Sequence, residues 1–227
     1  MTTLIGIKAL KGTPGIVLAS DLQASHEEWA RQGDEAYRIQ TKAQAQKITV
    51  DEKRTLAFCM AGVADRAYEQ FKLDFCKGHV NFQAAMLGRH FKELYELNLE
   101  RMGGAVWNNG LQNGLLVATR FGTPTLYTCF PLGKTEQRYW TALGSGSDHA
   151  NRYLRENLPT FEKNLSLADA VHHAHTALKH AATDIHTGGI DLCVITEQNI
   201  AEWGAKIKGR IDSAEQEVLQ EILTSVK

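Results

Sequence analysis

The sequence predicts an α+β fold with two mainly antiparallel sheets that carry helices on their outer faces. Apolar segments of strand length and amphipathic segments of helix length come in blocks, in the order strands, two helices, strands, two helices, strands, helix. A parallel sheet would require strands and helices to alternate one by one, so the block order favours antiparallel sheets. The 227 residues are 43% hydrophobic and 22% charged, which is typical of one generous globular domain or two small ones.

The first strands are predicted to form two hairpins. Residues 2–9 and 15–20 are apolar runs separated by a turn with Gly and Pro, and residues 47–51 and 55–60 are separated by a short charged turn. Residues 22–46, between the two hairpins, are polar and are expected to form a loop.

Two pairs of helices follow. The first pair is expected at residues 64–77 and 81–102, and the second begins with a helix at residues 148–157. Ser166 opens the fourth helix, because Ser-x-x-Asp ending at Asp169 is a capping box. The remaining expected elements are strands at residues 115–120, 125–130, 138–142, 191–196 and 200–204 and a last helix capped by Asp212.

Charge and residue usage exclude several classes of function. The formal net charge is −1, so there is no electrostatic reason to expect nucleic acid or an anionic membrane as partner. No apolar run is long enough to span a bilayer, and the N-terminus lacks the basic and then apolar pattern of a signal peptide. The four cysteines are scattered without C-x-x-C spacing, which indicates free thiols in the cytoplasm.

The most informative stretch is the start of the chain. Removing Met1 would leave Thr2 with a free α-amine at the start of a strand. An N-terminal threonine can act as a nucleophile because its own α-amine, with an unperturbed pKa of about 7.7–8.0, can accept the hydroxyl proton. Taken alone, Met-Thr-Thr is also an ordinary way for a chain to begin, so the hypothesis depends on the residues downstream.

Six motifs support it, and they occur in a fixed order. They are Thr-Thr-Leu-Ile-Gly at residues 2–6, Ala19-Ser20-Asp21, Lys47 before an apolar strand, Ala61-Gly62 followed by Ala64-Asp65, Gly-Ser-Gly-Ser at residues 144–147, and Asp184 followed by Thr-Gly-Gly, Ile-Asp and a Val-Ile-Thr strand. In these motifs the chain resembles the proteasome β-subunit family, including the bacterial HslV-type subunits, along nearly its whole length. Thr187 stands where the family usually has serine. The long Asp21–Lys47 segment and the C-terminal helix favour a stand-alone bacterial homologue, of HslV-like or betaproteobacterial type.

The resemblance implies a fold, an assembly and an activity. The expected fold is a four-layer αββα sandwich of N-terminal-nucleophile hydrolase type, with residues 1–227 forming a single proteasome β-type domain. The expected activity is that of a threonine-type endopeptidase that cleaves unfolded polypeptides inside stacked rings of 12 or 14 identical subunits. An ATP-dependent unfoldase is the expected partner, and no cofactor and no metal ion is expected.

The resemblance also implies a role for each candidate residue. Thr2 would be the nucleophile rather than Thr3, because Thr2 keeps the family's spacing to Gly6. Lys47 would favour the ionised hydroxyl and Asp21 would hold Lys47 as an ion pair. The segment between Asp21 and Lys47 is about ten residues longer than is usual in the family, so Lys42 is an alternative. Lys47 is preferred because it directly precedes the apolar strand.

Further residues complete the expected site. Gly62 would donate its backbone N–H to the oxyanion, while Ser145, Asp184 and Thr187 would form a polar cluster near the amine of Thr2. The residues that would line the pocket for the substrate side chain before the cut are Ala24, Ala45, Met60 and Ala64.

Two other patterns suggest alternative sites. The Gly-Ser-Gly-Ser loop could cradle a phosphate, but His149 stands where a dinucleotide motif needs its last glycine. The fourth helix carries His172, His173, His175 and His180 off its apolar stripe. Their spacing favours a polar flank or a subunit contact over a zinc site.

Two other classes of function compete with the peptidase. A ring-forming scaffold with a decayed site, similar to the proteasome's α-type subunits, would carry an extra N-terminal helix before the first strand. An amidase of the wider N-terminal-nucleophile group would act on a small molecule, but the Gly-Ser-Gly-Ser and Asp-x-x-Thr-Gly-Gly pair favours the proteasome branch.

Overall fold

The computed structural model describes a large part of the chain. The described residues are 2–32, 35–62, 66–76, 87–93, 96, 114–130, 132–158, 164–182, 190–203, 221 and 224, and of residues 23–44, 66 and 67 only the backbone is described. Asp184, Thr187, Ala64 and the cap Asp212 therefore lie outside the described residues. None of the described helices is long and apolar enough to cross a bilayer.

Two five-stranded sheets form the centre of the molecule. The first has the order β10-β1-β2-β11-β12, with bounds Trp140–Gly144, Thr3–Ala9, Gly15–Asp21, Ile190–Thr196 and Ile200–Glu202. The second has the order β5-β6-β7-β8-β9, with bounds Thr49–Val50, Leu56–Ala61, Gly114–Thr119, Thr125–Cys129 and Thr135–Arg138. Every strand pair in both sheets is antiparallel.

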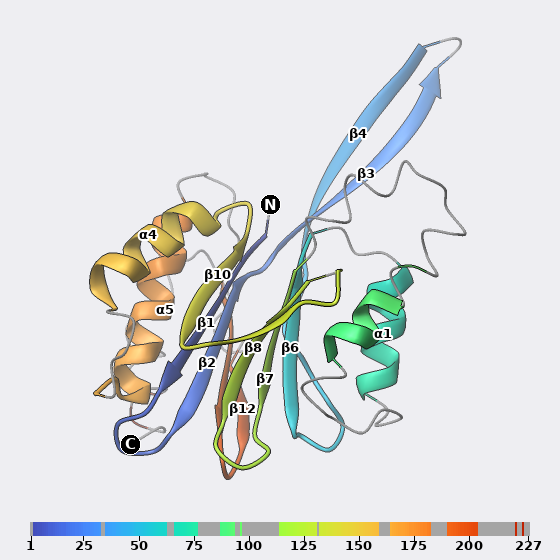
Figure 1. Ribbon diagram of the computed structural model, residues 1–227. Helices are drawn as coiled ribbons and strands as arrows, with labels where there is room; N and C mark the ends of the chain where they lie inside the picture. Colours follow the sequence, from blue (N-terminus) through green and yellow to red (C-terminus); the bar gives the residue numbers. More distant parts are fainter. Residues whose placement is uncertain are drawn as a thin grey trace.

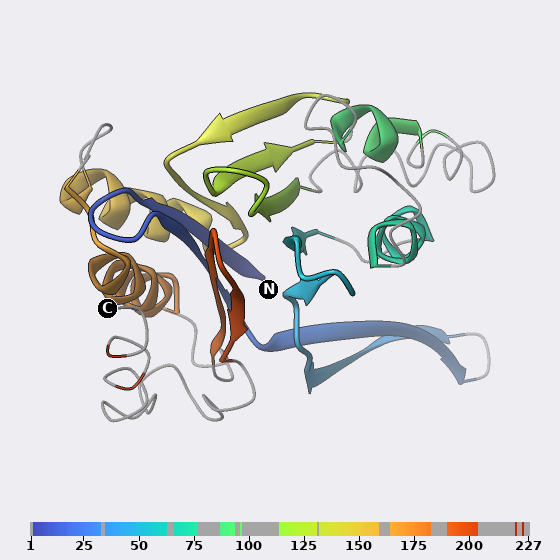
Figure 2. The same cartoon turned by 90° about the horizontal axis from the view of Figure 1, so that it is seen from below.

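Helices cover the outer face of each sheet (Figures 1 and 2). Helices α4 (Ser147–Asn157) and α5 (Leu167–Ala181) pack on the first sheet, and α1 (Arg66–Cys76) with helical residues 87–93 packs on the second. The fold is therefore the predicted four-layer αββα sandwich.

Three apolar cores join the four layers. The core between α4, α5 and the first sheet includes Ile5, Val17, Leu154, Val171 and Leu178. The core between the sheets includes Leu4, Leu18, Cys59, Leu116 and Cys193, and the core under α1 includes Phe58, Phe71, Phe75, Phe91 and Leu115. Burying each such side chain contributes about 1.5–3 kcal/mol, so the sheets form a rigid support for groups at their ends.

Local sequence signals account for the elements around the site. The β1–β2 and β5–β6 hairpins form as predicted. Ser166 caps α5, because its Oγ accepts from the Asp169 backbone N–H while the Asp169 carboxylate accepts from the Ser166 N–H. This reciprocal pair satisfies amides that the first turn of a helix cannot pair internally.

The expected loop at residues 22–46 is wrong. The chain forms a third sheet there, of two strands, in which β3 (Gln23–Gln32) pairs with β4 (Glu35–Gln44) over ten residue pairs. Figure 1 shows this hairpin projecting from one end of the sandwich. Its polar composition hid the strands, although Gly33-Asp34 between them is typical of a two-residue hairpin loop.

The expected single strand at residues 138–142 is also wrong. The chain forms two strands there, because it passes from the second sheet to the first at Tyr139. The carbonyl of Tyr139 accepts from Lys8 of β1, and β10 continues along β1 from there. This crossing brings the end of β10 to the start of β1.

Candidate active site

Four segments meet at the end of the sandwich from which β3 and β4 project (Figure 1). They are the start of β1, the end of β2, the chain that returns from β4, and the turn between β10 and α4. The β1–β2 and β1–β10 ladders hold the start of β1, the end of β2 and the end of β10 in register, pairing Leu4 with Ser20 and Thr3 with Gly144. Residues far apart in the sequence therefore surround Thr2.

Lys47 connects Thr2 to Asp21. Its ammonium donates to Asp21 Oδ2 at 2.8 Å and to Thr2 Oγ1 at 3.2 Å. The side chain of Lys47 is 10% exposed and that of Asp21 is 1% exposed. A buried ion pair needs its remaining polar atoms satisfied, and Asp21 Oδ1 also accepts from the Thr3 backbone N–H at 2.6 Å.

Burial shifts the pKa of Lys47. Desolvation lowers the pKa of Lys47 below its ordinary value, and the nearby Asp21 carboxylate opposes that shift. The ammonium thus stands close to the Thr2 hydroxyl in surroundings where its charge is weakly screened. A cation in that position stabilises negative charge that develops on Thr2 Oγ1.

The turn between β10 and α4 holds the backbone of Thr2. Ser145 N donates to the Thr2 carbonyl at 2.9 Å, and the Thr2 N–H donates to Ser145 Oγ at 3.2 Å. Gly144 permits this contact, since it has φ 99° and a Cβ there would lie 1.9 Å from the Thr2 carbonyl oxygen. An L-residue at position 144 would displace Thr2.

The same contact places the end of β6 near Thr2. A Cβ on Gly144 would also lie 3.4 Å from the Ala61 Cβ, so the Ala61–Gly62 step is adjacent to the site. Gly62 is exposed and has φ 124°, a conformation that favours glycine. These facts locate Gly62 at the edge of the site, where an N–H could meet a substrate carbonyl.

A second buried carboxylate holds the backbone of Lys47. Asp191 on β11 is 1% exposed, and its Oδ2 accepts from the N–H groups of Lys47 at 3.1 Å and Ile48 at 2.9 Å. Burial raises the pKa of Asp191, and the two amide donors oppose the shift. In the sequence, Asp191 is marked only by the Ile-Asp pair after Thr-Gly-Gly, because its contact with Lys47 joins residues 144 positions apart.

A thiol also lies near the lysine, but it is inert. Cys59 is fully buried between the sheets, and burial raises the pKa of its thiol well above the ordinary value, with the nearby Asp191 charge adding to the shift and Lys47 opposing it. Since the thiolate is the nucleophilic form, Cys59 is no competitor for the role of Thr2.

Part of the chain is similar to a known protein family. Residues 106–195 match the family model of the proteasome subunit. This part of the chain is therefore similar to proteasome subunits. The matched segment runs from before β7 into β11 and includes Gly144 and Ser145, whereas Thr2, Asp21 and Lys47 lie outside it. No curated protein matches the chain.

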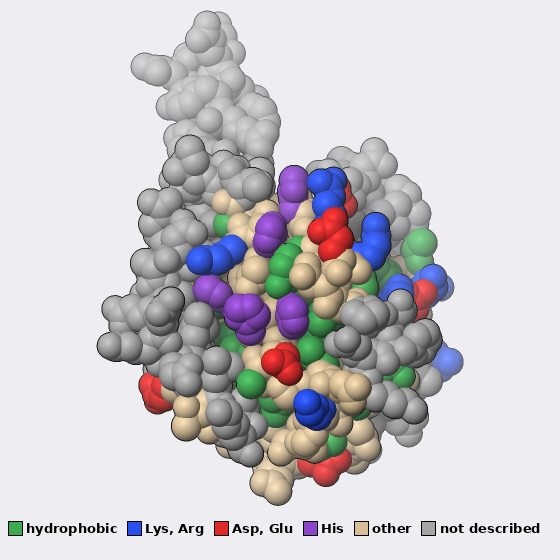
Figure 3. Space-filling view, turned by 90° about the vertical axis from the view of Figure 1, so that its left-hand side faces the viewer, with side chains coloured by type: hydrophobic (Ala, Val, Ile, Leu, Met, Phe, Trp, Pro, Cys, Tyr) green, Lys and Arg blue, Asp and Glu red, His purple; other side chains and the backbone are tan. Residues whose placement is uncertain are grey.

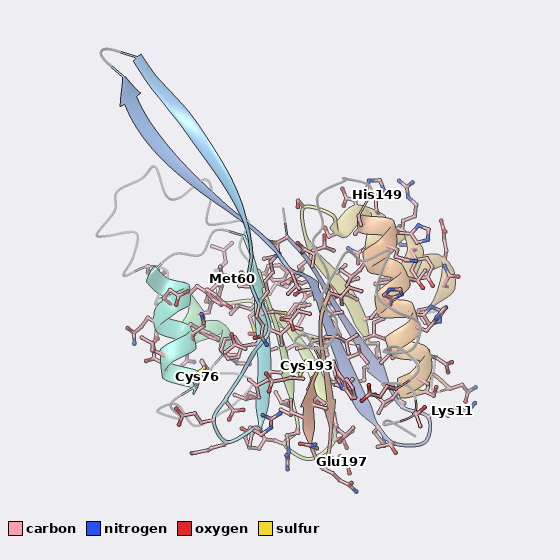
Figure 4. The ribbon with its side chains drawn as sticks, turned by 180° about the vertical axis from the view of Figure 1, so that it is seen from behind. Lys11, Met60, Cys76, His149, Cys193 and Glu197 are labelled. Atoms are coloured by element: carbon pink, nitrogen blue, oxygen red, sulfur yellow. The ribbon has the colours of Figure 1, made fainter. Side chains whose placement is uncertain are left out.

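The expected substrate pocket is only partly described. Met60 is 7% exposed and belongs to the core under α1, the side to which it points in Figure 4. Ala45 is half-buried, and its N–H donates to the Leu22 carbonyl, which closes the base of the β3–β4 hairpin. Only the backbone of Ala24 is described, and Ala64 lies outside the described residues.

Histidines of α5 contribute to the packing of α5 against α4. Figure 3 shows histidines gathered on the outer layer formed by α4 and α5. His173 Nδ1 lies 3.0 Å from the Tyr153 hydroxyl, and His180 stacks on the Tyr153 ring. His175 is 7% exposed, so its expected place off the buried stripe is wrong. Within the described residues, no group of three or more potential ligands could hold a metal ion.

Proposed function

We propose that the chain is a threonine-type endopeptidase subunit that cleaves unfolded polypeptides, with Thr2 as nucleophile once Met1 has been removed. The observation that carries the proposal is the contact of the buried Lys47 ammonium with both Thr2 Oγ1 and Asp21. A structural ion pair would need only Lys47 and Asp21. A lysine that also contacts the hydroxyl of Thr2 is arranged to assist a nucleophile.

The proposed acylation step begins at Thr2. Its α-amine accepts the Oγ1 proton while Oγ1 attacks the carbonyl carbon of the scissile peptide, and Lys47 stabilises the charge that develops on Oγ1. The Gly62 N–H donates to the oxyanion of the tetrahedral intermediate. The α-ammonium then returns its proton to the departing amine, which leaves an ester between Thr2 and the substrate.

Deacylation uses the same groups in reverse. The α-amine accepts a proton from water, the hydroxide attacks the ester carbonyl, and Thr2 Oγ1 leaves with a proton from the ammonium. Ser145, which contacts the Thr2 nitrogen, orients the amine. By resemblance to the family, Asp184 and Thr187 would join this cluster, and Ala24, Ala45 and Ala64 would line the pocket for the residue before the cut, whereas Met60 packs in the core under α1.

The lowered pKa of Lys47 predicts a narrowed pH profile. The acid limb of kcat/KM should follow protonation of the Thr2 α-amine, and the alkaline limb should follow deprotonation of Lys47. Because burial lowers the Lys47 pKa, activity should begin to fall at a lower pH than an ordinary lysine, with its pKa of about 10.4, would allow. Initial rates of peptide hydrolysis between pH 5 and pH 11 measure this, and a flat alkaline limb up to about pH 11 would show that activity does not depend on a Lys47 ammonium of lowered pKa.

The proposed assembly follows the family. Members of the proteasome family form stacked rings, and we propose a homo-oligomer of 12 or 14 copies, served by an ATP-dependent unfoldase. Sequestering Thr2 inside such rings would restrict cleavage to unfolded chains.

A cytoplasmic location is part of the proposal, supported by the four free cysteines. An HslV-like or betaproteobacterial type is likewise proposed, on the basis of the motifs and the long Asp21–Lys47 segment.

The proposal is tested with unfolded polypeptide and purified protein that has lost Met1. Hydrolysis by the wild-type chain and none by a Thr2→Ala variant is the expected result. Equal hydrolysis by both would mean that the activity does not come from Thr2.

A further inference from the structure

The strongest unassigned feature is the buried carboxylate of Asp191. The structure holds Lys47 at two points: Asp21 binds the ammonium, and Asp191 binds the backbone. The β2–β11 ladder fixes both carboxylates, because it pairs Ile190 with Asp21 and Asp191 with Ser20. The two acids therefore come from adjacent strands of one rigid sheet, one register position apart.

The backbone contact matters because a lysine side chain is long. Its ammonium sits at the end of a flexible four-carbon stem, so the position of the main chain decides which atoms it can reach. The segment before Lys47 returns from the β3–β4 hairpin, whose ladder joins β3 only to β4. Anchoring Lys47 and Ile48 to β11 ties this returning segment to the first sheet where the nucleophile also sits.

We propose that Asp191 is a positioning residue for the threonine peptidase reaction. Its Oδ2, by accepting both the Lys47 and Ile48 N–H groups, fixes the main chain so that the Lys47 ammonium reaches Thr2 Oγ1 and Asp21 together. Asp191 acts through Lys47 and makes no contact with the substrate. The inference rests on the proposed function and assigns a further residue to the same site.

The variants Asp191→Ala and Asp191→Asn separate positioning from charge. Alanine removes both amide contacts, whereas asparagine keeps an acceptor oxygen for them and loses only the negative charge. A displacement of about 1 Å at a catalytic group can cost about 100-fold in rate. Asp191→Ala should therefore lower kcat about 100-fold with little change in KM, and Asp191→Asn should stay within about fivefold of wild type.

Asp51 supplies the matched control. It is also a buried carboxylate that binds two backbone N–H groups, those of Thr55 and Leu56, but it lies at the opposite end of β6 from Gly62. Asp51→Ala should lower the melting temperature and leave kcat at 25 °C near wild type. An equal loss of kcat in Asp51→Ala and Asp191→Ala would show a general packing effect and overturn the inference.

Two further results would also overturn it. One is wild-type kcat in Asp191→Ala, and the other is a kcat in Asp191→Asn as low as in Asp191→Ala, because that pattern assigns the effect to charge. Crystal structures give a readout that does not depend on activity. The Lys47 Nζ–Thr2 Oγ1 distance, 3.2 Å here, should exceed about 4 Å in Asp191→Ala and stay unchanged in Asp191→Asn. If Thr2→Ala retains full activity, the proposed function fails, while this distance still decides whether Asp191 positions Lys47.

Discussion

Replacing Thr2 by alanine lowers peptide hydrolysis at least about 10³-fold, because it removes the hydroxyl that attacks the substrate and that Lys47 contacts. Such a loss corresponds to about 4 kcal/mol of transition-state stabilisation. The fold should be unaffected, since Thr2 is half-buried and its backbone contacts to Ser145 do not require the side chain. Initial rates with a fluorogenic peptide, together with melting temperature and native mass, measure both effects.

Two companion variants make this result specific. Thr2→Ser keeps a hydroxyl on the same atom and should retain activity within about tenfold of wild type. Thr3→Ala keeps the backbone N–H that donates to Asp21 and should retain most of its activity. If Thr3→Ala were inactive and Thr2→Ala active, the nucleophile would have been assigned to the wrong threonine.

Replacing Lys47 by methionine should lower kcat about 10³-fold, which is the second-largest expected effect. Methionine keeps most of the apolar stem and removes the ammonium, so Thr2 Oγ1 loses its cation and the buried Asp21 loses its ion-pair partner. An uncompensated buried carboxylate can destabilise a fold by about 3–5 kcal/mol, so rates must be compared at a temperature where both proteins are folded.

The matched control is Lys42→Met, on the neighbouring strand β4. It removes a lysine from the same long segment and should leave kcat within about twofold of wild type, because Lys47 already contacts Thr2 and Asp21. Loss of activity in Lys42→Met together with wild-type kcat in Lys47→Met would identify Lys42 as the active-site lysine.

Features with a local cause could be predicted from the sequence. The Ser166 capping box and the β1–β2 turn depend on residues a few positions apart, and the structure confirms them. The β3–β4 hairpin was missed because its strands lack an apolar alternation, which is the signal that normally reveals a half-buried strand. The crossing at Tyr139 was missed because one continuous run of residues serves two different sheets.

The site was predictable only in part. Resemblance to the family singled out Thr2, Asp21 and Lys47, and the structure brings these three together. The contact of Asp191 with the Lys47 backbone has no local signal, because it depends on the β2–β11 register and on where the chain returns from β4. Successive side chains of β6 point to opposite faces of its sheet. Met60 therefore packs under α1, while its neighbours Cys59 and Ala61 face the other sheet.

The intact mass of the purified protein, with and without a peptide epoxyketone, tests the central claim most directly. This reagent bonds to both the hydroxyl and the α-amine of an N-terminal threonine. The account predicts loss of Met1 and a single stoichiometric adduct, which Thr2→Ala should not form. Loss of Met1 without any adduct in the wild-type chain would contradict a live threonine nucleophile and favour a ring-forming scaffold.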